Sequence, residues 1–254
     1  MRPFGVVSAL VVAWSLLLAP GDARAAGGLT ANEQAMLEDL LGPGVLGEPV
    51  AGSTLTPSFA PLRDGTWTYQ IVGGKQKGQT EQHVVNRLER DPSGASWRYA
   101  IGSTGVVFIE GTDDGSLTFV TEEDTEQGVL TRYEPAEPGL LSGLAPGDSK
   151  TSRVAVKVYD LSSPDDLAHE GELEVTYSYL GAYKANTPAG SYDAALIKWT
   201  YEGKVGPAKV EDSQYRFFAD NVGMVASVDK LDVSAFLVYQ DHSKFGKLLA
   251  QAPK

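Results

Sequence analysis

The chain has 254 residues, with 33 acidic and 21 basic side chains, a formal net charge of −12 and no cysteine. Nucleic-acid phosphates are bound mainly through lysine and arginine, so we expect no nucleic-acid partner for a chain this acidic. Without cysteine, disulfides, thiolate metal sites, a cysteine nucleophile and acylation at a lipobox cysteine are all excluded.

Residues 1–25 have the organisation of a Sec signal peptide. Arg2 lies in a short basic region, Val6–Leu18 is an apolar run, and Ala23 and Ala25 are the small residues that signal peptidase needs. Cleavage after Ala25 is therefore expected. No later apolar run reaches the roughly 20 residues that span a bilayer, so we predict a periplasmic or secreted protein with no transmembrane segment in its mature chain.

Residues 26–63 are predicted to form a helix and a connector. Thr30 is a helix N-cap, Glu33 completes a capping box, and Gly42 with Pro43 ends the helix. Apolar residues at helical spacing form one stripe: Met36, Leu37, Leu40 and Leu41. We expect this stripe to pack on the main body, and residues 42–63 to connect it to a β-rich domain at 64–254.

From Asp64 onward the pattern changes to the period of two that a half-buried strand requires. The first half contains predicted strands at 67–71, 79–90, 97–101, 106–109, 117–119 and 129–133. Asp113-Asp114-Gly115 predicts a hairpin turn. The strand at 79–90 is polar, and we expect it to be exposed.

The second half begins after a proline- and glycine-rich stretch at 135–148, which is either a subdomain seam or a crossover loop. Predicted strands follow at 154–158, 173–179, 192–201, 214–218 and 222–228, with a polar loop at 161–169. Residues 233–239 fit a strand or part of a helix; we favour a strand followed by a weakly ordered end.

About a dozen short strands with one clear helix predict a mainly β protein. The expected architecture is a curved antiparallel sheet that forms a half-open barrel or a sandwich, with the helix at its N-terminus.

Three segments of the second half carry a resemblance to a family. Leu144-Ala-Pro-Gly147 precedes a valine-rich strand, Thr187-Pro-Ala-Gly-Ser-Tyr-Asp-Ala194 opens the next long strand, and Tyr215–Ala219 runs into Asn221–Val225. This order, over residues 144–229, resembles uncharacterised proteobacterial envelope proteins, similar in shape to the half-open β-barrels of periplasmic lipoprotein carriers. The resemblance implies that fold and no established activity. Members with a lipid anchor have a lipobox, which this sequence lacks.

Motifs for catalysis are absent from the sequence. The three histidines, His83, His169 and His242, have no metal-ligand spacing and are expected to be solvated at the surface. No serine-nucleophile motif or phosphate-binding glycine loop occurs, and the acidic runs are typical of exposed loops. We therefore predict no catalytic residues, no metal, no cofactor and no enzymatic activity.

Aromatic residues at strand period are the remaining candidates for function. They would form either a sheet core or the lining of an apolar cavity inside an incompletely closed barrel. The candidate ligand-binding face consists of Trp67, Tyr69, Trp97, Tyr99, Tyr177, Tyr179, Trp199 and Tyr201.

Three functions are consistent with these patterns. The first is a periplasmic binding or carrier module whose ligand is an apolar small molecule or lipid. The second is an interaction or structural protein of the envelope, with a closed core, no ligand and another envelope protein as partner. The third is a hydrolase of envelope polymers, which would require two facing carboxylates or a His–Asp pair in a cleft.

Overall fold

The computed structural model describes residues 28–89, 96–235 and 239–253, so the predicted signal peptide at 1–25 lies outside the described residues. The N-terminal helix is present as α1, from Ala31 to Leu41. As predicted, Thr30 accepts from the backbone of Glu33, and the Glu33 side chain accepts from the backbone of Thr30. Gly42, with a φ of 99°, ends the helix in a conformation that suits glycine.

Thirteen strands and one short 3-10 helix follow in the described part of the chain. The first seven strands are β1 (Leu46–Val50), β2 (Gly65–Ile71), β3 (Thr80–Arg87), β4 (Trp97–Ile101), β5 (Gly105–Gly111), β6 (Leu117–Asp124) and β7 (Val129–Leu140). The remaining strands are β8 (Ser149–Asp160), β9 (Ser163–Thr187), β10 (Gly190–Val205), β11 (Ala208–Ala219), β12 (Gly223–Ala235) and β13 (Tyr239–Gln251). The 3-10 helix η1 (Pro57–Phe59) lies between β1 and β2.

Strands β2 to β13 form a closed antiparallel barrel, which corrects the prediction of a half-open one. Most neighbours in the barrel are consecutive in sequence, and β13 pairs with β2 to join its two ends. The last link is the pairing of β8 with the first half of β9, from Ser149 opposite Ser178 to Asp160 opposite Ser163. The prediction of a polar loop at 161–169 is wrong for residues 163–169, which form the start of β9 and pair with the end of β8.

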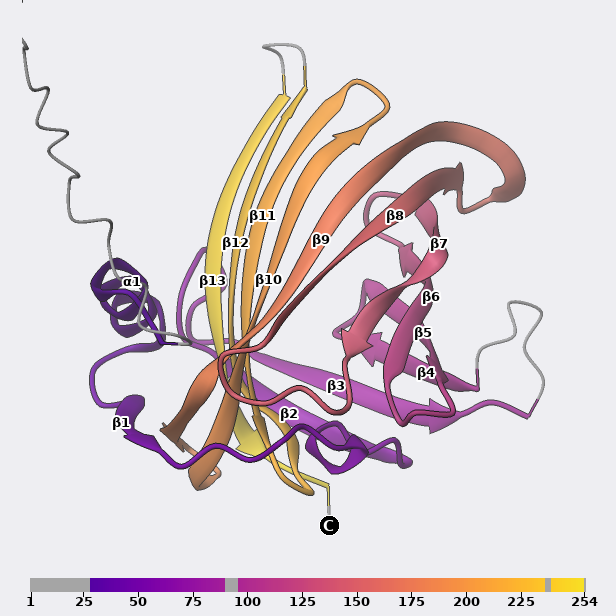
Figure 1. The fold of residues 1–254 in the computed structure, drawn as a ribbon. Coiled ribbons are helices and arrows are strands. Elements are labelled where there is room, and N and C mark those ends of the chain that lie inside the picture. The colour runs from indigo at the N-terminus through magenta and orange to yellow at the C-terminus, as the bar shows by residue number, and fades with distance from the viewer. Residues whose placement is uncertain (1–27, 90–95, 236–238, 254) are drawn as a thin grey trace, which may run out of the picture.

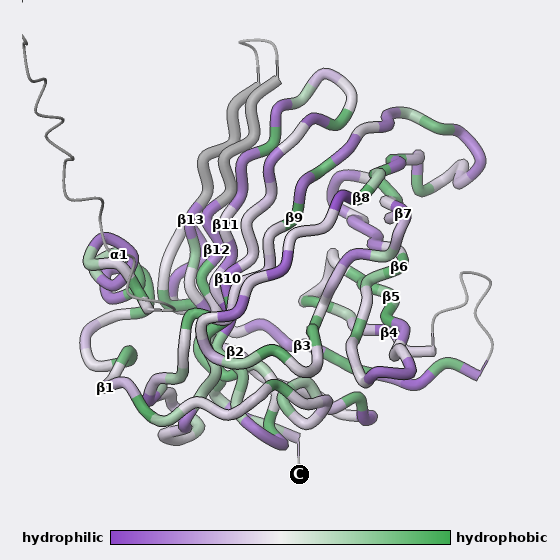
Figure 2. The backbone as a smooth tube through the Cα atoms, viewed as in Figure 1, coloured by the Kyte–Doolittle hydropathy of each residue, from purple (hydrophilic) through white to green (hydrophobic). Residues whose placement is uncertain are grey.

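The barrel has two unlike walls (Figure 1). The long strands β9 to β13 curve side by side and project as hairpins. Strands β2 and β3 lie below them in this view and β4 to β7 lie to the right, and β2 to β6 are shorter, with five to eight residues each. Hydrophobic and hydrophilic segments alternate along the chain (Figure 2), as expected for a sheet with one face inside. On β9, for example, Leu173, Val175, Tyr177 and Tyr179 are buried, and all four belong to the core of the barrel.

Helix α1 packs on the outer face of the long-stranded wall, mainly against β13 (Figure 1). Leu37 and Leu41 are fully buried there, as the apolar stripe predicted. Glu33 accepts hydrogen bonds from Lys198 of β10 at 2.7 Å and from the Tyr215 hydroxyl of β11 at 2.9 Å. The central strand predicted at 192–201 is β10, in which four successive residues from Ala194 to Ile197 are buried on both faces.

Three other segments differ from the sequence-based expectation. The connector 42–63 contains β1, which pairs with the second half of β9. The proline- and glycine-rich stretch 135–148 spans the end of β7 and the connection to β8. At the C-terminus, a single strand is predicted at 233–239. Its first residues belong to β12, which ends at Ala235, and Tyr239 begins β13; residues 236–238 are not among the described residues. The predicted weakly ordered end is wrong, because β13 continues to Gln251 and pairs with β2.

Candidate ligand-binding cavity

The barrel encloses a cavity of about 390 Å³, which is within the range of small-molecule sites. Every barrel strand except β8 contributes lining residues, together with residues 60–62 of the connector. The apolar part of the lining includes Val85, Val107, Ile109, Phe119 and Phe218. The polar part of the lining contains an arginine, a lysine, a histidine and four carboxylic acids. The interior is therefore amphipathic and is not a purely hydrophobic core.

Five of the eight aromatic residues predicted as a binding face line this cavity: Trp67, Tyr69, Tyr99, Trp199 and Tyr201. The other three belong to the packing around it. Tyr177 is fully buried, with its ring 4.9 Å from that of Trp199, and Tyr179 donates to the backbone of Ser53 at 3.1 Å. Trp97 is half-buried and packs against two groups of buried hydrophobic residues, one that includes Val107 and Tyr177 and one that includes Val85 and Leu248. The structure thus brings part of the set together and leaves three members outside the cavity.

The cavity aromatics are held by polar contacts as well as by packing. The indole nitrogen of Trp67 donates to the carbonyl of Val222, and the hydroxyl of Tyr69 donates to the carbonyl of Met224, each at 2.8 Å. These two bonds tie β2 to the start of β12 across the interior. Trp199 donates to the carbonyl of Pro138 at 3.1 Å. Because buried polar tips of aromatic residues need partners, these contacts fix the rings in place.

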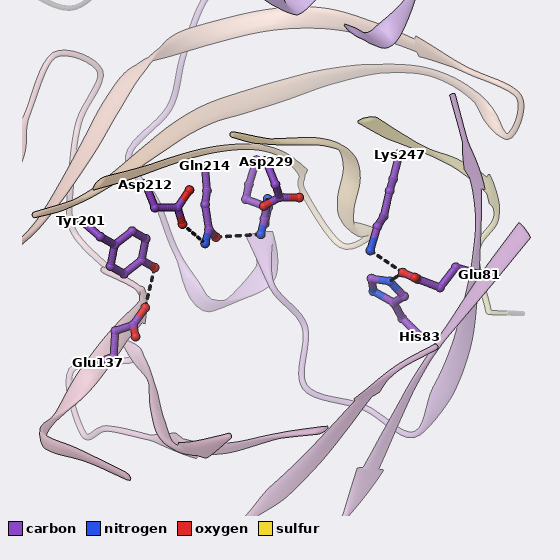
Figure 3. Close-up of polar contacts among 9 residues, drawn as sticks. Glu81, His83, Glu137, Tyr201, Asp212, Gln214, Asp229 and Lys247 are labelled. Atoms are coloured by element: carbon purple, nitrogen blue, oxygen red, sulfur yellow. Dashed lines mark hydrogen bonds and ion pairs between the residues drawn. The ribbon is translucent and has the colours of Figure 1, made fainter. Parts of the chain in front are cut away.

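A histidine–carboxylate cluster lies on β3 (Figure 3). His83 is 2% exposed; its Nδ1 lies 2.5 Å from the Tyr99 hydroxyl and its Nε2 lies 2.6 Å from Oε1 of Glu81. Lys247 of β13 also donates to Glu81. Burial would raise the pKa of Glu81, but the hydrogen bond from His83 and the charge of Lys247 hold it at about 2. Glu81 is therefore ionised, His83 donates to it from Nε2, and Tyr99 donates to the remaining ring nitrogen.

The position of His83 corrects the prediction of a solvated surface histidine. On β3, residues 81, 83 and 85 point inward, and the strand is exposed only on its other face. Burial lowers the pKa of His83, so the ring is neutral at pH 7. His169 is exposed, as predicted. The side chain of His242 lies outside the described part of the structure.

A second polar chain runs along the inward row of β11 (Figure 3). Arg216 donates from Nη1 to Asp229 of β12 at 2.6 Å and from Nη2 to Oε1 of Gln214 at 2.8 Å. Gln214 in turn donates to Oδ2 of Asp212 at 2.7 Å. The other oxygen of that carboxyl, Oδ1, is buried without a hydrogen-bond partner among the residues that the structure describes.

Two more carboxylic acids lie at the same end of the cavity as Asp212. Tyr201 donates to Glu137 at 2.5 Å, and Tyr133 donates to Glu122 at 2.8 Å. Burial raises the pKa of Glu137 to about 8, opposed by the Tyr201 bond and supported by the charges of Glu122 and Asp212. Burial, with the nearby charge of Asp229, also raises the pKa of Asp212, to about 6.

These polar interior residues were not identified from the sequence. A period-two signal was available, because Asp212, Gln214 and Arg216 share a face with Phe218, and Glu81 and His83 share one with Val85. Polar residues at strand period are usually read as the solvent face, so only the register of the closed barrel reveals that these rows point inward.

Within the described ranges, no group of three or more histidine, aspartate or glutamate side chains could hold a metal ion. No helix in that part of the chain is both long and apolar enough to cross a membrane.

The fold and its cavity define the chain as a closed antiparallel β-barrel with an amphipathic interior. A family model described as DUF3108-like matches residues 180–230, from the end of β9 into β12. The match overlaps the segment 144–229, over which the sequence resembles a family of unknown function. No curated protein matches the chain.

Solved structures similar to the chain include three bacterial proteins. A putative lipoprotein of Parabacteroides distasonis is 14% identical, with 78% of this chain and 99% of that one covered and a TM-score of 0.42. A putative exported protein with a YmcC-like fold from Bacteroides fragilis is 14% identical, with 77% and 99% covered and a TM-score of 0.43. The hypothetical lipoprotein YmcC of Escherichia coli is 9% identical, with 76% and 86% covered and a TM-score of 0.38.

Proposed function

We propose that this protein is a non-enzymatic binding or carrier module of the bacterial envelope, whose barrel takes up one apolar or lipid-like molecule. The observation that carries the proposal is the cavity of about 390 Å³ lined by Trp67, Tyr69, Tyr99, Trp199 and Tyr201. Close packing normally leaves few voids larger than a water molecule in a protein interior. A cavity of this size, mostly apolar with a few fixed polar groups, has the composition of a ligand site.

An exported location fits this function. The first 25 residues have the features of a Sec signal peptide. In an aqueous compartment, the transfer of an apolar molecule from water into such a cavity lowers the free energy.

Hydrolysis is the less favoured function, although the cavity holds a histidine–carboxylate pair. The hydroxyl beside His83 belongs to Tyr99, and burial raises its pKa well above the usual value. Tyr99 is therefore a poor nucleophile at neutral pH. Glu81 is also shared with Lys247, as expected for a structural ion-pair network.

The proposal is tested by native mass spectrometry of the mature protein purified from its own envelope without detergent. A bound apolar molecule of defined mass, at one copy per chain, is the expected result. Protein that is free of bound molecules and also fails to take up an apolar dye would contradict the proposal. That outcome would favour the alternative of an envelope interaction protein with no ligand.

A further inference from the structure

We propose that the acidic end of the cavity, formed by Asp212 and Glu137, receives the primary amine of an amphipathic ligand whose apolar part lies against the aromatic lining. This inference rests on the proposed binding function and specifies the chemistry of the ligand's polar end.

The first observation is the imbalance of charged groups around the cavity. Among the described residues, two basic side chains line it, Arg216 and Lys247, and both are already paired with carboxylates. The carboxylic acids Glu122, Glu137 and Asp212 line it as well, and no ion pair is formed by any of the three in the described part of the chain. The unmatched groups inside the barrel are therefore acidic, and a cationic group would complement them.

The second observation is the unpartnered oxygen of Asp212. The residue is 9% exposed and lies on the inward row of β11, and Gln214 occupies only its Oδ2. Within the described structure, Oδ1 has no hydrogen-bond donor. A buried acceptor without a donor is destabilising, so a hydrogen bond donated to Oδ1 by a ligand would stabilise the complex.

The polar chain behind Asp212 explains why the free position is an acceptor. Arg216 donates to Asp229 and to Gln214, and Gln214 donates to Asp212, so the last hydrogen bond of this chain points toward Asp212 (Figure 3). The chain ends on an oxygen, which cannot bond to a carboxylate or phosphate. Glu137 adds a second carboxyl, held by Tyr201, at the same end. An ammonium group has three donors: Oδ1 of Asp212 can accept from one, and an oxygen of Glu137 can accept from another whether or not that carboxyl carries its proton.

The test compares three probes that share a ten-carbon chain: decylamine, decanol and decanoate. Each is used to displace the uncharged dye Nile red from the mature protein at about 0.15 M salt, where charges on the exposed surface are largely screened. Decylamine is expected to compete about tenfold better than decanol, and decanol better than decanoate. Equal competition by decanol and decylamine, or stronger competition by decanoate, would overturn the inference while leaving the proposed function intact.

Two isosteric variants identify the site. In Asp212→Asn the amide oxygen can accept from Gln214, which turns the amide N–H₂ toward the free position, so the preference for decylamine over decanoate should be lost or reversed. Glu137→Gln keeps the acceptor for Tyr201 and should weaken decylamine selectively. Asp193→Asn, which changes an exposed carboxyl on β10 paired with Lys184, is the matched control and should leave the competition by all three probes unchanged.

An unchanged order of competition by the three probes in both interior variants would contradict the inference. If Nile red and all three probes fail to bind, the proposed function fails and the inference fails with it.

Discussion

Lys247 is a single residue whose loss should be costly, because its ion pair with Glu81 lies inside the barrel. Its side chain is 10% exposed and that of Glu81 is 18% exposed. Removing one partner of a buried pair leaves the other charge without compensation. We expect Lys247→Met to lower the free energy of unfolding by about 2 kcal/mol in urea titrations. The double variant with Glu81→Gln should recover more than half of that loss; a double variant as unstable as the sum of both single changes would argue against the pairing.

Glu137 should make the protein less stable as the pH rises. Its pKa is raised from 4.5 to about 8 in the native state, so between these values the native protein holds a proton that the unfolded chain has lost. The free energy of unfolding therefore falls as the pH rises, by about 3 kcal/mol from this group between pH 5 and pH 7.5. Glu137→Gln should flatten this dependence.

The matched control for that prediction is Glu134→Gln, an exposed glutamate on the same strand. It should keep the wild-type pH profile in denaturant unfolding. A wild-type profile that stays flat between pH 5 and pH 7.5 would mean that Glu137 is ionised in the native barrel.

At the scale of elements, helix α1 is attached to the sheet through Glu33. Burial would raise the pKa of this carboxyl, but Lys198 and the bonds to Thr30 hold it at about 2. Its contribution is therefore complete above pH 4.5 and is lost as the pH falls toward 2. We expect Glu33→Ala to cost about 1–2 kcal/mol at pH 7 through loss of the cap and the ion pair.

The same variant should increase amide hydrogen exchange in α1 before the barrel strands are affected. Asp39→Ala, an exposed acidic change on the same helix, is the control and should leave exchange unchanged. Equal exchange in α1 of the wild type and Glu33→Ala would show that the helix is held by Leu37 and Leu41 alone.

Local sequence patterns were sufficient to predict most of the helices and strands. The start of β9 and the position of His83 were not predicted, for physical reasons. The capping box at Thr30 and the alternation around Trp67 predicted α1 and β2 because both signals act within a few residues. Closure of the barrel depends on pairing between β8 and residues 163–178 of β9. The alternation of Leu173, Val175 and Tyr177 marks the second part of this segment, but residues 164–170 are all exposed, so no hydrophobic period marks the start of the strand. The position of His83 was missed for the related reason that an inward polar row has the same period as an outward one.

At the scale of the whole molecule, the walls of the barrel leave an amphipathic cavity where most interiors are filled. We propose that a ligand occupies this space. The two variants Val210→Phe and Val107→Phe each place a ring into the cavity from opposite sides of the lining, on β11 and β5. Leu167→Phe, at an exposed position of β9, is the matched control.

The most direct measurement is saturation binding of Nile red by fluorescence to the wild type and these three variants, each checked for cooperative unfolding. We expect one dye per wild-type chain, a loss of affinity of about tenfold or more in Val210→Phe and Val107→Phe, and wild-type binding in Leu167→Phe. Absence of saturable binding to the wild type, or wild-type affinity in both filled variants, would contradict the proposal.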